Sequence, residues 1–128
     1  MVHTVILYAG ILGLMNFLIA TRPGFMRGST GISVGDGGNP QLLLAMRRHA
    51  NFAEWVPLAL LLIALLETQG VSATVIHSLG ASLVVARAAH AIGIKGDTVQ
   101  GAGRAIGAFG TALVTIVTSV WLLVEYFT

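Results

Sequence analysis

The chain has no cysteine and few charged residues, and these two shortages limit what it can be. Without cysteine it can form no disulfide, no thiolate metal site and no cysteine nucleophile. Charged residues make up 9% of its 128 residues, against about 25% in soluble domains. The hydrophobic share is 55% and the mean hydropathy is +0.86. The composition therefore predicts an integral membrane protein.

Two kinds of partner are also poorly supported by what the sequence contains. The seven basic residues are scattered singly or in one pair, so the basic patch that nucleic-acid binding requires is missing. The four histidines are dispersed and lack the i, i+4 spacing of a helical metal site. We therefore expect no nucleic-acid partner and no metal.

Long apolar runs, by contrast, cover most of the chain. They fall at about residues 4–21, 40–67, 71–93 and 104–127. Each is near or above the ~20 residues needed to cross ~30 Å of hydrocarbon, and in lipid such runs satisfy their backbone groups as helices. We expect an all-α fold in which residues 1–128 form one transmembrane domain, a four-helix bundle.

The connections between these runs differ in character. Residues 22–39 are polar and rich in glycine, and Asn39 is placed to cap a helix that begins at Pro40. Residues 67–70 leave room only for a tight turn, and residues 94–103 form a third polar connection. The chain is thus expected to run up and down through the membrane.

Basic residues are absent from the second connection and from both termini. Six of them lie in or near the first and third connections, namely Arg22, Arg27, Arg47, Arg48, Lys95 and Arg104, and the seventh, Arg87, is two turns inside the third run. Because basic residues collect on the cytoplasmic side, we expect the first and third connections in the cytoplasm and both termini outside.

Small residues recur at every fourth position of the last run. Gly103, Gly107, Thr111, Thr115 and Ser119 would share one face of a helix. Such a stripe could form a polar pathway, but it more often allows another helix to pack closely. We expect the close packing.

Polar residues at the start of the second run are the main functional clue. On a helix, Arg47, Asn51 and Glu54 fall within about 60° of one another. A charge inside the bilayer costs roughly 2.5–3.5 kcal/mol, so a membrane span rarely keeps one without a structural or functional role. One use is structural, an Arg–Glu pair with an amide that bridges helices; the other is a ligand site. Arg48, on another face, is expected to snorkel or to face lipid.

The third and fourth runs bring more positive charge to the same depth. Arg87 and His90 are spaced i, i+3 in the third run, and Arg104 begins the fourth. Glu54 cannot neutralise these arginines and Arg47 together. A net positive cavity favours an anionic ligand over purely structural pairing.

With these residues the chain resembles the MAPEG family, the membrane-associated proteins of eicosanoid and glutathione metabolism, and especially its bacterial members. The pattern that carries the resemblance is Arg47-x-His49-x-Asn51-x-x-Glu54, followed by Arg87-x-x-His90 and Arg104. The resemblance implies a homotrimer in the bacterial inner membrane, with glutathione between neighbouring subunits in the cytoplasmic leaflet. It implies that glutathione is held by Arg47, Asn51, Glu54, Arg87 and His90, and that Arg104 stabilises its thiolate.

The implied activity is that of a glutathione transferase or peroxidase acting on lipophilic electrophiles that arrive through the lipid. Several catalytic members, however, place a tyrosine just beyond the Arg-x-x-His pair, where this chain has Ile92 and Ile94. Tyr8 and Tyr126 lie at the far ends of their runs. The alternative is a non-catalytic lipid-binding or scaffold member. A proton-coupled drug exporter of this size would need a Glu in the first run, which has no acid.

Overall fold

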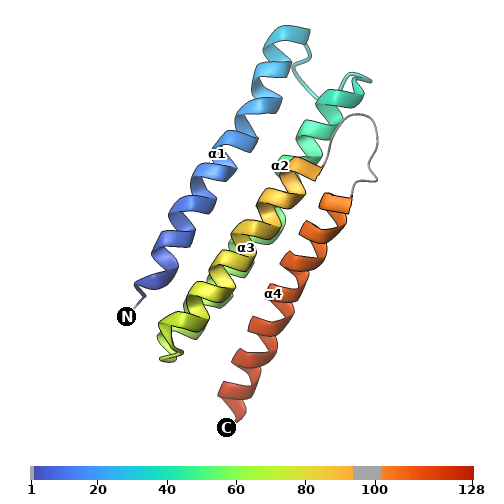
Figure 1. Cartoon of the computed structure of the whole chain (residues 1–128). Helices are drawn as coiled ribbons and strands as arrows, with labels where there is room; N and C mark the ends of the chain where they lie inside the picture. The colour runs from blue at the N-terminus through green and yellow to red at the C-terminus, as the bar shows by residue number, and fades with distance from the viewer. Residues whose placement is uncertain (1, 94–101) are drawn as a thin grey trace.

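Four long helices make up nearly all of the part of the chain that the computed structural model describes, residues 2–93 and 102–128. They are α1 (Thr4–Thr30), α2 (Pro40–Thr68), α3 (Ala73–Gly93) and α4 (Ala102–Phe127). Figure 1 shows them as an up-and-down bundle with both ends of the chain on one side. Each helix is long and apolar enough to cross a membrane. The prediction of an all-α, integral membrane four-helix bundle is therefore confirmed.

Large apolar side chains cover the outside of the bundle as well as its inside. Phe17 and Leu18 on α1 are 65% and 68% exposed, and Phe109 on α4 is 76% exposed. Acyl chains would contact these surfaces in a bilayer, whereas in water they would be a large uncovered apolar patch. The interior is a second apolar layer whose fully buried members include Leu12, Phe52, Ile63, Leu66, Ile76 and Leu83.

Helix α1 is nine residues longer than its apolar run. We expected the first span to end near residue 21 and a loop to follow, but α1 continues to Thr30 and ends at Gly31, which has φ 71°. Hydropathy indicates where the hydrocarbon ends, not where the helix ends, and a left-handed glycine is a common helix stop. At ~1.5 Å per residue, α1 is about 40 Å long and extends beyond a ~30 Å hydrocarbon core.

The predicted start of the second helix and the tight turn that follows this helix are confirmed. The Asn39 side chain accepts hydrogen bonds from the backbone N–H groups of Gln41 and Leu42, at 3.0 and 3.1 Å. Pro40 occupies the first helical position, where a missing N–H costs nothing. Between α2 and α3 the chain turns within a few residues at Gly70, which has φ 83°. The third predicted connection lies mostly outside the described residues, and so do Lys95 and Ile94.

The end of α2 holds the beginning of α1. Glu67 is only 9% exposed, and its carboxylate accepts hydrogen bonds from the backbone N–H groups of His3, Thr4 and Val5. His3 itself makes no side-chain cap for α1. A negative charge here satisfies three unpaired N–H groups and complements the positive end of the helix dipole. Glu67 thereby fixes α1 and α2 in register at the end that carries the termini.

Replacing Glu67 with glutamine should lower the free energy of unfolding by about 1–2 kcal/mol, because a neutral amide is a weaker acceptor for the three N–H groups. Thermal unfolding in detergent measures this loss. Glu125→Gln is the matched control, since Glu125 lies near the same end, is exposed, and accepts a hydrogen bond from Trp121 Nε1 within its own helix. Equal effects of the two substitutions would contradict the capping role.

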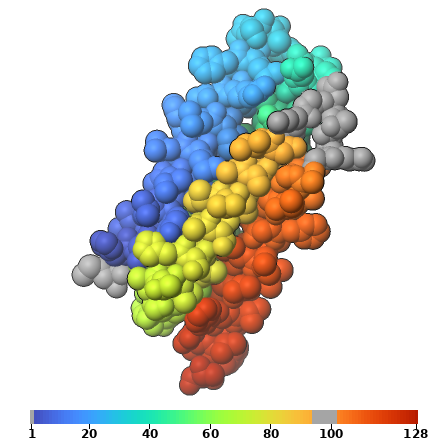
Figure 2. All heavy atoms as spheres, viewed as in Figure 1, coloured from blue at the N-terminus to red at the C-terminus, as the bar shows by residue number. Residues whose placement is uncertain are grey.

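Helices α3 and α4 approach each other most closely along the predicted small-residue stripe. A methyl group at Gly107 would overlap the carbonyl oxygen of Ala86 and the Cβ of His90. One at Gly103 would lie 3.1 Å from the carbonyl oxygen of Ala89. The expectation that this stripe lets another helix pack closely is confirmed, with α3 as that helix. Figure 2 shows α3 and α4 lying against each other along this face of the molecule.

Candidate functional site

Arg87 is the most deeply buried charged residue in the described chain. It projects from α3 into the bundle and is 1% exposed. Its Nη2 donates a hydrogen bond to Oδ1 of Asn51 on α2, at 2.9 Å. Its guanidinium carbon lies 5.7 Å from the centroid of the Phe52 ring, within range of a cation–π interaction. Its Nε is buried without a hydrogen-bond partner. Arg87 is thus held in place but only partly satisfied.

His90 lies one turn further along α3 and is 4% exposed. The positive charges of Arg87, Arg104 and Arg48 all lie near enough to act on it. The backbone of α4 passes directly over His90 because Gly107 has no side chain. The helix crossing that the glycine permits therefore brings the start of α4, where Arg104 lies, beside α3.

The structure divides the predicted site residues into two groups. Asn51, Arg87 and His90 face the interior, and Asn51 and Arg87 are in direct contact. Arg47, Glu54 and Arg104 are exposed on the outside of the single chain. A helix stripe about 60° wide is broad enough to turn one edge inward and leave the other outward. The cluster is therefore partly buried and partly open at the surface.

The structural alternative for the polar stripe is only half realised. Asn51 does bridge two helices, as an interhelical amide should. The Arg–Glu pair of this alternative is not formed, since Arg47 and Glu54 share no ion pair in residues 2–93 and 102–128. Packing of these described residues therefore leaves both exposed charges available for another partner.

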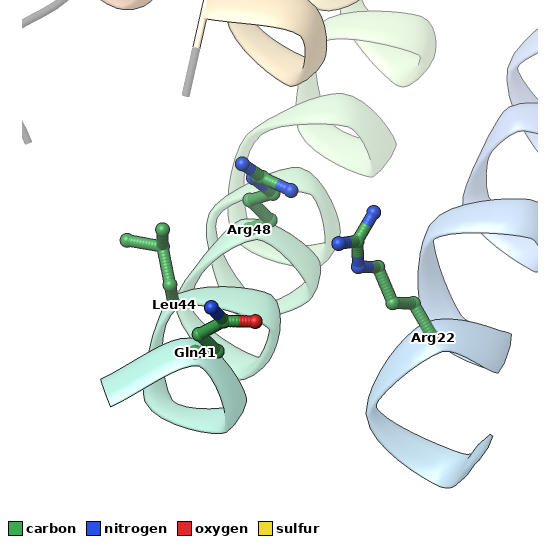
Figure 3. Close-up of a pocket in the computed structure, with 4 residues that line it drawn as sticks. All are labelled: Arg22, Gln41, Leu44 and Arg48. Carbon is green, nitrogen blue, oxygen red and sulfur yellow. The ribbon is translucent and has the colours of Figure 1, made fainter. Parts of the chain in front are cut away.

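Sequence reasoning missed the part played by Arg48. We expected it to snorkel or to face lipid, but it is half-buried, and its Nε is buried without a hydrogen-bond partner. Figure 3 shows its guanidinium directed towards Arg22 of α1 across a pocket of about 200 Å³. The signal that could have found it is the adjacent arginine pair, since two neighbours on a helix point about 100° apart and need not share the same surroundings.

The tyrosine that catalytic relatives carry has no replacement near this cluster among the described residues. Ile92, two residues beyond His90, is 66% exposed and has no hydroxyl. The Tyr8 hydroxyl is hydrogen-bonded with Nδ1 of His77 at 2.8 Å, and its ring lies over Gly80. That contact is near the termini, at the other end of the bundle. The described residues also contain no group of three or more potential metal ligands.

Replacing Asn51 with leucine should lower the free energy of unfolding by about 2 kcal/mol, because the buried Arg87 loses its acceptor. Removing the charge as well, in Asn51→Leu with Arg87→Met, should recover most of that loss, since an apolar pair of similar volume replaces a buried polar one at little cost. Chemical or thermal unfolding in detergent measures both. If the double variant is less stable than Asn51→Leu, the pair is not coupled as the structure indicates.

Comparison with known proteins identifies a family for the chain. The model of the MAPEG family matches residues 5–124 of the chain. The inner membrane protein YecN of Escherichia coli K12 is 34% identical over 62 residues, which cover 48% of this chain and 47% of that protein. YecN of Escherichia coli O6:H1 matches to the same extent. The chain thus aligns with about half the length of these curated relatives. No solved structure matches it.

Proposed function

The chain belongs to the MAPEG family, and from this premise we propose that it binds glutathione at the cluster around Arg87. The observation that carries the proposal is the buried Arg87–Asn51 contact, with the charges of Arg48 and Arg104 close by at His90. Glutathione brings two carboxylates and one ammonium group. Several arginines with a single acid, Glu54, suit that charge pattern.

Each residue has a distinct role in this proposal. Arg87 and Asn51 bind the peptide part of glutathione from the interior, and His90 acts beside them. Arg47 and Glu54 bind its charged ends from the outer edge, with Glu54 opposite the ammonium group. Arg104 lies next to the sulfur and stabilises the thiolate, which is the nucleophilic form.

The exposed half of the cluster favours assembly as a homotrimer. Arg47 and Glu54 lie on the outside of one chain, within a membrane-spanning helix. Charges in that position are costly if they face lipid and are tolerable at a contact between subunits. Glutathione bound between neighbouring copies would be held from both sides, and a lipophilic electrophile would reach its sulfur from the bilayer.

The proposal also covers the location of the protein and its orientation in the membrane. We place the protein in the inner membrane, in line with the name of its Escherichia coli relatives. The excess of basic residues puts the α1–α2 connection in the cytoplasm and the termini outside. Glutathione is then taken from the cytoplasm, and the activity is that of a transferase or peroxidase on lipophilic electrophiles.

One observation favours a second function, that of a non-catalytic member that binds lipid. Ile92 stands where several catalytic relatives carry a hydroxyl, and it is exposed on the outer face of α3. In this case the same cluster would hold an anionic ligand without activating it.

The two functions are separated by adding glutathione to the purified, detergent-solubilised protein and recording the ultraviolet difference spectrum. A saturable thiolate band, together with turnover of a generic aromatic electrophile, is expected for the enzyme. Saturable binding with no band would support the non-catalytic function. Absence of any glutathione binding would contradict the proposal.

A further inference from the structure

A second cluster of positive charge lies between α1 and α2, apart from Arg87. Four residues line a pocket of about 200 Å³ there, Arg22 from α1 and Gln41, Leu44 and Arg48 from the first turns of α2. In Figure 3 the two guanidinium groups point towards each other across the gap, and the Gln41 amide faces the same space. The pocket therefore presents hydrogen-bond donors from two helices to one point.

The charges in this pocket are not compensated by the part of the chain that the structure describes. Arg22 and Arg48 repel each other. Neither has a carboxylate within ion-pair distance among the residues that the structure describes. The Nε of Arg48 is buried and has no hydrogen-bond partner. A buried donor without a partner is costly, and two facing guanidinium groups provide the planar, bidentate donors that phosphate oxygens accept.

The depth of the pocket can be obtained from the contact at the other end of the bundle. Glu67 of α2 binds the backbone of Thr4 in α1, so the two helices are in register there. Arg22 lies eighteen residues from Thr4, and Arg48 nineteen residues from Glu67. At ~1.5 Å per residue, both arginines are about 27–29 Å away from that end. A ~30 Å hydrocarbon core places them at its opposite boundary, where lipid phosphates lie.

From this geometry we propose that Arg22, Arg48 and Gln41 form a binding site for a phosphate group, supplied by the headgroup of an anionic phospholipid. The headgroup lies between α1 and α2 and its acyl chains extend along the exposed apolar faces of these helices. Basic pockets between transmembrane helices are a recurrent form of lipid recognition. Bound there, the lipid bridges the two helices at the end opposite to Glu67.

This site is separate from the proposed glutathione site in its position and in its chemistry. Arg22 belongs only to the pocket, while Arg87 and Asn51 belong only to the interior cluster. Arg48 is near both, because its charge also acts on His90. Arg22 is therefore the residue whose replacement tests the lipid site alone.

The test uses the full chain, delipidated in a phosphate-free maltoside detergent and titrated with phosphatidylglycerol, phosphatidylcholine or inorganic phosphate. Native mass spectrometry counts the bound lipid, and thermal unfolding reports stabilisation. We expect phosphatidylglycerol to bind about ten-fold more tightly than phosphatidylcholine, because only the former is a net anion. Arg22→Gln and Arg48→Gln should each weaken its binding by about ten-fold.

Arg27→Gln is the matched control, with the same charge change on the same helix. Arg27 lies outside the pocket and donates to the carbonyl oxygen of Ile32 and to the sulfur of Met46. It should leave phosphatidylglycerol binding unchanged. Stabilisation by inorganic phosphate that requires Arg22, with no preference for phosphatidylglycerol, would support the phosphate site and assign it to a soluble ligand instead of a lipid.

Equal binding of both lipids, unaffected by Arg22→Gln and without an effect of phosphate, would overturn the proposal. The glutathione difference spectrum, recorded on the same samples, tests the glutathione site independently of the lipid site. Arg22→Gln should lose the lipid and keep the spectrum, whereas absence of the spectrum in the wild type would contradict only the proposed function.

Discussion

Replacing Arg104 with alanine is expected to lower the rate of glutathione conjugation about 100-fold and to keep much of the glutathione binding. In the proposed site, glutathione binding relies mainly on residues of α2 and α3, and the proposed role of Arg104 is to act on the sulfur from the start of α4. A fixed positive charge beside the sulfur stabilises the thiolate, and removal of one such group from an active site typically costs about 10²–10³ in rate. The loss should appear in kcat with a smaller change in KM.

The measurement combines the thiolate difference band with turnover at several pH values. In Arg104→Ala the band should vanish at neutral pH, and part of the activity should return at alkaline pH, where the thiol ionises unaided. Arg104→Lys is the matched control, because it keeps the charge and should keep part of the band. Unchanged turnover in Arg104→Ala would show that another residue activates the thiol.

Replacing Gly107 with alanine is expected to destabilise the bundle by about 3 kcal/mol, the upper end of the usual cost of overpacking. The new methyl group would overlap the backbone of α3 at Ala86 and His90, and backbone cannot rotate away as the end of a flexible side chain can. Helices α3 and α4 would have to separate, and His90 would move with them. The same substitution should therefore also weaken glutathione binding.

Thermal unfolding in detergent measures the stability change, and the glutathione titration measures the second effect. Gly24→Ala is the matched control, since Gly24 lies in α1 with no atom within 4 Å of the added methyl group. That substitution should be neutral or slightly stabilising, because alanine favours helix over glycine. A Gly107→Ala protein as stable as Gly24→Ala would show that the crossing is looser than in the structure.

Much of the fold could be predicted because local features of the sequence determine it. Hydropathy located the four helices, Asn39 with Pro40 located the start of α2, and the repeat of Gly103 and Gly107 indicated the close helix contact. The end of α1 could not be located in this way, because its last nine residues are helical but interrupt the apolar run with arginines and glycines. Only Gly31 marked the stop, among several glycines that looked equivalent.

The site was harder to predict because it depends on how far each helix is rotated about its axis. Periodicity placed Arg47, Asn51 and Glu54 on one stripe but gave no indication of which edge faces the interior. The structure turns Asn51 towards Arg87 and leaves the two charged residues outside. Arg48 was misjudged and the capping role of Glu67 was not predicted for a related reason, since the surroundings of both residues come from helices distant in sequence.

The capping contact of Glu67 has a consequence for how the chain enters the membrane. The carboxylate lies 64 positions after His3, so the ribosome must synthesise all of α2 before the first turn of α1 is capped. Until then α1 presents unpaired N–H groups at its tip. The helical hairpin of α1 and α2 is therefore the smallest part of the chain in which the first turn of α1 is capped, and a chain interrupted before residue 67 would leave that turn without its anchor.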